Sequence, residues 1–157
     1  MTTAAELPAL LEGVRARLAA AGARQVELAE SVPERRVLGF RRRPTLRKAG
    51  RGWLLGALIL REDGALLDAG TPTRAKREAR VGYSAESARE RDALRHMAER
   101  AGFAEGAAVH VDPRPAEAGP LVAGGAGELL VRWSRSPGIA PVPLSAYLEE
   151  RAELLGA

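Results

Sequence analysis

The sequence has no cysteine, and aromatic residues make up only 4% of its 157 positions. The absence of cysteine excludes a disulfide framework, a thiolate nucleophile and a cysteine-based zinc site. There is no run of about 18 apolar residues, and charges interrupt the apolar positions of the N-terminus, so we expect neither a membrane span nor a signal peptide. We therefore predict a cytoplasmic protein without membrane contact, and no motif in the sequence predicts a cofactor or a metal.

Lysine is also nearly absent, because 22 of the 24 basic residues are arginine. A composition rich in Arg and Ala is typical of GC-rich coding, so the net charge of +4 is weak evidence about function. The distribution of charge is more informative. Residues 35–51 contain eight basic side chains and no acidic one, whereas acidic residues outnumber basic ones in the rest of the chain.

Hydrophobic periodicity predicts three helices and a set of short strands. The helices are expected over residues 5–21, 85–101 and 144–155. Strands are expected at residues 37–40, 53–60, 65–69, 73–83, 108–111, 120–122 and 128–133, with a short helix as the alternative for 73–83. The short connections favour an α+β fold in a single globular domain, residues 1–157, with an antiparallel sheet of about six strands and three helices packed mainly on one side.

Two stretches carry more specific predictions. The run WLLGALIL at residues 53–60 is uncharged throughout, which predicts one central strand covered on both faces. Glu62-Asp63-Gly64 then predicts a hairpin turn. Residues 23–35 are polar and end in Pro33-Glu34, which is typical of a connector.

The basic stretch is the main candidate site. Arginine presents a planar fork of donors that suits phosphate and carboxylate oxygens. The predicted anion-binding residues are Arg41, Arg42, Arg43, Arg47, Lys48 and Arg51, supported by Arg35 and Arg36, and joined by Arg74, Lys76, Arg77 and Arg80 if residues 73–81 pair beside them. The partner would be a nucleic acid, bound with steep salt dependence, an acidic protein or a small anion.

The alternative interpretation of this stretch is structural. Cationic side chains and proline commonly protect a strand edge against pairing with another chain, and the sequence alone favours this explanation. Phe40 and Trp53 bracket the stretch but adjoin apolar runs, so we expect both rings in the core. The stretch would then lack the exposed rings on which single-stranded nucleic acid stacks.

Catalytic signals are weak. His110 and Asp112 could converge as a metal site or a general base, but no third ligand is identified. The residues around His96 do not match the spacing of a metal-binding motif either. None of the serines lies in a G-x-S-x-G or S-x-x-K motif, so no catalytic residue is assigned and we lean against an enzyme.

Three functional hypotheses follow. The first is a non-catalytic binding or accessory protein that uses the basic stretch. The second is a small-molecule binder or enzyme with a pocket involving His110 and Asp112. The third is a structural, self-associating domain that forms a homo-oligomer.

Four stretches are similar to those of a small family of uncharacterised proteins from high-GC bacteria. They are RRVLGFRRRP at 35–44, WLLGALIL at 53–60, VGYSAESARERDAL at 81–94 and VPLSAYLEERAELL at 142–155, so the resemblance spans almost the whole chain. Some members of the family are labelled glutaminase. This sequence has neither the cysteine nucleophile nor the S-x-x-K pair of known glutaminases, so the resemblance assigns no catalytic residue here.

Overall fold

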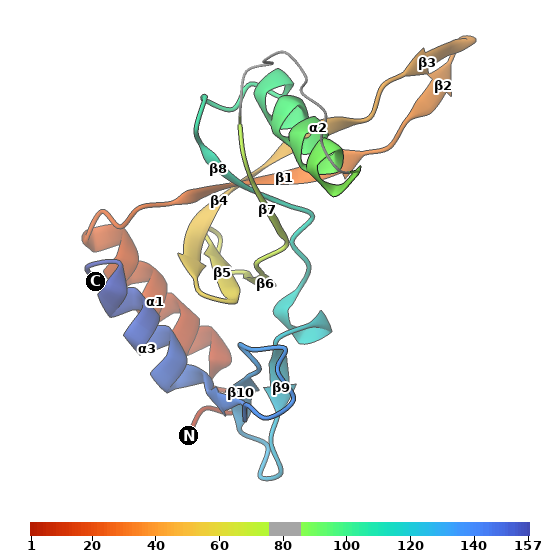
Figure 1. The fold of residues 1–157 in the computed structure, drawn as a ribbon. Helices are drawn as coiled ribbons and strands as arrows, with labels where there is room; N and C mark the ends of the chain where they lie inside the picture. The colour runs from red at the N-terminus through yellow and green to blue at the C-terminus, as the bar shows by residue number, and fades with distance from the viewer. Residues whose placement is uncertain (76–85) are drawn as a thin grey trace. The chain divides into compact units, whose positions relative to one another are not determined.

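The computed structural model describes residues 1–75 and 86–157 (Figure 1). The chain divides into two compact units, each built from several segments. The first unit comprises residues 1–25, 51–69 and 114–157, and the second comprises residues 26–50 and 70–113. Because the segments of the two units alternate along the chain, no single connector separates them.

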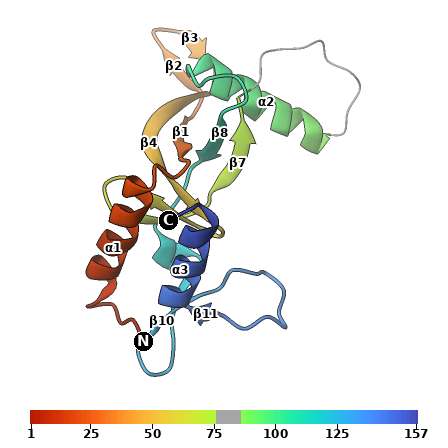
Figure 2. The ribbon, with the colours of Figure 1, turned by 90° about the vertical axis from the view of Figure 1, so that its left-hand side faces the viewer.

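The first unit is built around a pair of helices that lie side by side (Figure 2). Its helices are α1 (Leu7–Ala20), α3 (Leu144–Leu154) and the short 3-10 helix η1 (Ala116–Ala118), and its strands are β5 (Leu58–Arg61), β6 (Leu66–Asp68), β9 (Leu121–Ala123), β10 (Leu129–Val131) and β11 (Val142–Pro143). Leucine recurs at helical spacing along α1, and this stripe packs into a core in which Leu18, Leu58 and Leu148 are completely buried. The expected helices 5–21 and 144–155 are confirmed, although Leu154 is 70% exposed and not on the buried face.

The second unit packs one helix on a group of strands. Its elements are β1 (Val26–Val32), β2 (Arg35–Val37), β3 (Phe40–Arg42), the first part of β4 (Thr45–Leu55), β7 (Thr71–Arg74), α2 (Glu86–Arg100) and β8 (Ala108–Val111). Ala98 of α2 is buried in a small core with Phe103, Val109 and Val111. The expected helix 85–101 and strand 108–111 are confirmed. Of the expected strand 73–83, only Thr73 and Arg74 belong to β7, and residues 76–83 lie outside the described residues.

The main sheet has six strands in the order β6-β5-β4-β1-β8-β7, and β4 runs through both units. The α+β class is confirmed, but the purely antiparallel sheet is wrong, because β1 and β8 pair in parallel with Leu28 opposite His110. This pair joins segments about 80 residues apart, so local hairpin signals could not predict it. The prediction of a connector at 23–35 is also wrong, because residues Val26–Val32 form the central strand β1.

The run WLLGALIL is a hairpin and not one strand. Gly56 has φ +67, and β4 turns there into β5 with Leu55 paired to Leu58. The Tyr147 hydroxyl accepts a hydrogen bond from the Ala57 amide at 2.9 Å, and a Cβ at Gly56 would collide with this hydroxyl. Glycine is therefore needed at this position both for its positive φ and for the close approach of α3.

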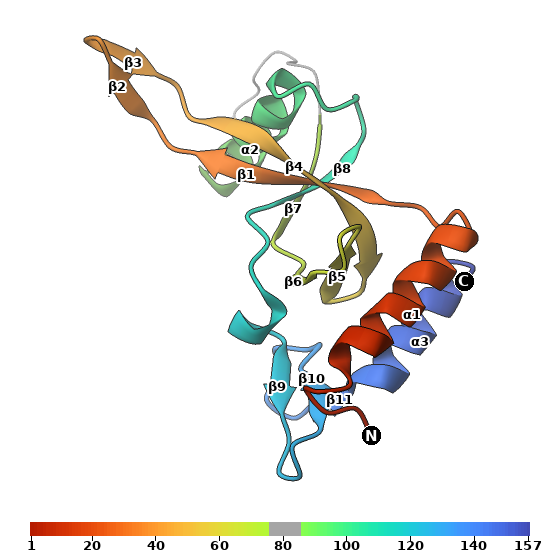
Figure 3. The same cartoon turned by 180° about the vertical axis from the view of Figure 1, so that it is seen from behind.

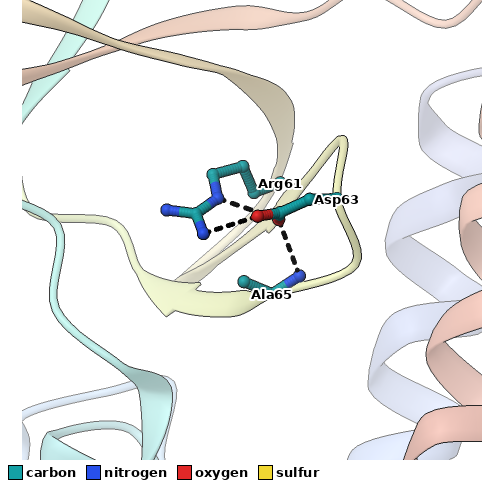
Figure 4. Close-up of polar contacts among 3 residues, drawn as sticks. All are labelled: Arg61, Asp63 and Ala65. Carbon is teal, nitrogen blue, oxygen red and sulfur yellow. Dashed lines mark hydrogen bonds and ion pairs between the residues drawn. The ribbon is translucent and has the colours of Figure 1, made fainter.

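The predicted turn at Glu62-Asp63-Gly64 is present between β5 and β6 (Figure 4). Asp63 accepts two hydrogen bonds from Arg61 and one from the Ala65 amide. The Arg61 guanidinium holds the pKa of Asp63 down at about 2. The hairpin expected from the strands at 120–122 and 128–133 is confirmed, because β9 and β10 pair in antiparallel orientation.

Among residues 1–75 and 86–157, the helices are too short or too polar to span a membrane.

Candidate functional site

The first part of the basic stretch forms a separate hairpin, here called the arm (residues 33–44). Strands β2 and β3 make a two-stranded sheet of their own, with Arg36 opposite Arg41. Pro33 follows β1 and Pro44 precedes β4, and neither can donate a backbone hydrogen bond, so the ladder is interrupted at the base of the arm. Figures 1 and 3 show the arm continuing beyond β1 and β4, away from the rest of its unit.

The tip of the arm is apolar. Leu38 has φ +52 and Gly39 has φ +81, and a two-residue loop with positive φ at both positions is the type I′ turn. This turn is usually built from Asn, Asp or Gly, so a leucine there is strained by about 1 kcal/mol or more. Leu38 is 93% exposed and Phe40 is 76% exposed.

Two sequence predictions about the tip are therefore corrected. The strand expected at 37–40 is interrupted by the turn, since Leu38-Gly39 connect β2 to β3. Phe40 was expected in the core but is exposed, whereas Trp53 is buried as expected, at 4% exposure. The sequence does contain a signal for a hairpin here, because Pro33 and Pro44 lie at equal distances on either side of Leu38-Gly39.

The arm has a large surplus of positive charge, with five arginines and the single acid Glu34 among residues 33–44. Arg35, Arg36, Arg41 and Arg43 are exposed. Arg42 lies opposite Arg35 in the register, and its side chain is outside what the structure describes. Like charges directly opposite one another weaken a strand pair. The Glu34 carboxylate lies 3.6 Å from the Arg41 guanidinium and offsets only part of this repulsion.

The cations that follow the arm take part in packing within their own unit. Arg47 donates a hydrogen bond to Glu30, and the Lys48 ammonium lies 5.2 Å from the centre of the Phe103 ring. The pairs of β4 with β5 run from Gly52 to Leu55, so the preceding part of β4 is an edge within the second unit. Edge protection explains Arg47 and Lys48 well. The arm, in contrast, is not part of the six-stranded sheet.

The remaining predicted cations lie on other elements, where the structure describes them. Arg51 is exposed and begins the part of β4 that belongs to the first unit. Arg74 is on β7, which pairs with β8 and not with β4, and its guanidinium donates to the Gly106 carbonyl at 3.1 Å. Lys76, Arg77 and Arg80 lie outside the described residues.

The pocket hypothesis gains no support from the placement of its two residues. His110 is 4% exposed in the middle of β8. Asp112 lies beyond the end of this strand with φ +52, is exposed, and accepts hydrogen bonds from the Ser31 amide at 2.8 Å and the Ser31 hydroxyl at 2.6 Å. The carboxylate thus fastens the ends of β1 and β8 together. A buried imidazole and an exposed, fully engaged carboxylate do not open onto one accessible site.

Within the described part of the chain, no group of three or more His, Asp or Glu side chains could hold a metal ion. Comparison of the chain with protein-family models, with curated proteins and with solved structures gave no match.

Proposed function

We propose that this protein is a non-catalytic binding protein and that the arm is its contact surface for a polyanion, with nucleic acid as the first candidate. The observation that carries the proposal is the exposure of four arginines, Arg35, Arg36, Arg41 and Arg43, on a hairpin outside the main sheet. Those of its side chains that the structure describes are not buried in a core, and its two strands form a sheet of their own.

The cross-strand register adds a physical argument. Arg36 and Arg41 face each other across the two strands, and this repulsion remains in the unbound hairpin. Phosphate groups bound by these two guanidinium groups would accept charge-assisted hydrogen bonds and reduce the repulsion. Anion binding would therefore stabilise the arm, which explains why a sequence unfavourable for the free hairpin is present.

The other two hypotheses fit the arm less well. An enzyme needs a reactive group in an accessible site, and the candidates His110 and Asp112 do not share one. Self-association through the arm would bring two arginine-rich hairpins together, and their like charges would oppose contact. An acidic protein could bind the same arginines, so the experiment below includes an acidic polypeptide.

The proposal is tested by fluorescence anisotropy at about 50 mM salt, with labelled duplex DNA, single-stranded DNA, RNA and polyglutamate as separate ligands. We expect the wild type to bind nucleic acid and the variant Arg36→Glu/Arg43→Glu to lose that binding. The matched control is Arg132→Glu/Arg135→Glu, which makes the same change in net charge at two exposed arginines of the first unit. Equal binding by the arm variant would refute the proposal, and preference for polyglutamate would identify an acidic protein as the partner.

A further inference from the structure

We infer that Leu38 and Phe40 form an apolar wedge that enters the minor groove of duplex DNA and opens one base step, while the arginines behind them hold the flanking phosphates. This inference rests on the proposed function, because it requires that the arm bind nucleic acid. It goes further by assigning the partner, the groove and the deformation of the DNA.

The first support is the chemistry of the tip. A type I′ turn is most easily made by Asn-Gly, which is also polar and suits an exposed loop. Leu38 instead adopts the left-handed conformation with 93% of its surface exposed, and Phe40 adds a second apolar side chain at 76% exposure. Neither stability nor solubility of the free protein favours this choice. Leu and Phe are among the side chains that proteins insert between base pairs from the minor groove.

The second support is the position of the charges relative to the tip. The exposed residues Arg36 and Arg41 form the second cross-strand pair from the turn, after Val37 and Phe40, with one arginine on each strand. The phosphates of a duplex form two rows, one on either side of the groove, and each strand of the arm carries one arginine of this pair, so each strand can supply a contact to one row. Insertion of the tip thus places arginine next to phosphate on both sides without any base-specific contact.

Three other occupants fit the tip less well. A membrane surface would receive only two apolar side chains, with fewer carbons than one myristoyl chain, which alone gives marginal membrane binding. Single-stranded nucleic acid stacks on several rings, and the arm has only Phe40. A second copy of the chain would bring two positively charged arms together.

The wedge is tested with a duplex of about 30 base pairs that has a donor and an acceptor dye at its ends and a central TA step, which unstacks easily. A second duplex carries 2-aminopurine at this step, so that unstacking raises its fluorescence. On saturation with wild-type protein we expect higher energy transfer, because the DNA bends, and brighter 2-aminopurine.

The test variant is Leu38→Asn/Phe40→Thr, which keeps a turn-forming residue at the tip and a strand-forming residue beside it. We expect it to bind at least about tenfold more weakly, to leave the DNA straight, and to retain the salt dependence set by the arginines. The matched control is Leu154→Gln, which removes another exposed leucine (70% exposed) from α3 and should behave as the wild type. Circular dichroism of each variant confirms that it is folded.

The outcomes separate the two proposals. Salt-dependent duplex binding that the tip variant retains in full, with no bending and no 2-aminopurine signal, would overturn the wedge and leave the proposed function standing. Absence of binding to any nucleic acid would overturn both. Binding to vesicles of phosphatidylcholine with 30% phosphatidylserine, in place of duplex DNA, would overturn the wedge in favour of a membrane-inserting tip.

Discussion

Neutralising two arginines of the arm should reduce by about 1.8 the slope of log K against log salt for binding to duplex DNA. The arm has four arginines whose exposed side chains the structure describes, Arg35, Arg36, Arg41 and Arg43. Each phosphate contact contributes about −0.9 to the slope of log K against log salt, so four contacts give a slope of about −3.6. Affinity should then fall about 150-fold between roughly 50 and 200 mM salt.

The perturbation is Arg36→Ala/Arg43→Ala. It leaves the ion pair between Arg41 and Glu34 in place, and we expect a slope of about −1.8 and a loss of only about 12-fold over the same range. The assay is anisotropy of a labelled 20-base-pair duplex at five salt concentrations, with Arg132→Ala/Arg135→Ala as the control of equal charge. Because the slopes are compared, the expected difference of about 1.8 does not depend on how many other cations contact phosphate. Parallel slopes for the wild type and the arm variant would refute the reasoning.

Two further predictions concern stability. Tyr147→Phe removes the hydroxyl that accepts a hydrogen bond from the Ala57 amide, and residue 147 is buried. The free energy of unfolding should fall by about 1–2 kcal/mol, seen as a lower urea midpoint with an unchanged m value. An unchanged midpoint would contradict the role given to this hydroxyl. Asp63 has its pKa lowered to about 2 by Arg61, so its contribution is complete above pH 4 and is lost as the pH falls through 2. Because its side chain is 58% exposed, Asp63→Asn should lower the free energy of unfolding at pH 7 by only about 0.5–1 kcal/mol, and the gap to the wild type should close in acid; a gap that is constant from pH 7 to pH 2 would contradict the ion pair.

Helical segments were predictable because their signal is local. The leucine stripe of α1 and the glycine after α2 each specify an element within a few residues of sequence. The turn at Glu62-Asp63-Gly64 was predictable for the same reason. In each case the side chain pattern and the backbone conformation agree.

The strands were harder to predict because their pairing is not local. Strand β1 carries Glu27 and Glu30 among its apolar residues, so its sequence resembles a polar connector. Its parallel partner β8 lies about 80 residues further along the chain, so no local signal indicates the pairing. The uninterrupted apolar run WLLGALIL predicts one strand, because the turn at Gly56 depends on a close approach of Tyr147 from a distant part of the sequence. A contact between distant segments cannot be inferred from periodicity.

The candidate site was predictable in charge but not in shape. The basic stretch was identified, yet its composition cannot separate cations engaged in packing, such as Arg47 and Lys48, from those exposed on the arm. Leu38 and Phe40 were missed as surface residues because apolar side chains are normally buried. Their exposure follows from the turn at Leu38-Gly39 and from the separation of the arm from the main sheet, and hydrophobic periodicity specifies neither.

The most direct test of the central claim is to map the binding surface by NMR, by titrating a short duplex into the ¹⁵N-labelled protein and following the backbone amides. We predict that the largest chemical-shift changes fall on residues 33–44, with those of Leu38 and Gly39 among them, and that residues of α1 and α3 are unaffected. Shifts concentrated elsewhere in the chain, or none at a duplex excess that saturates anisotropy, would contradict the assignment of the arm as the binding surface.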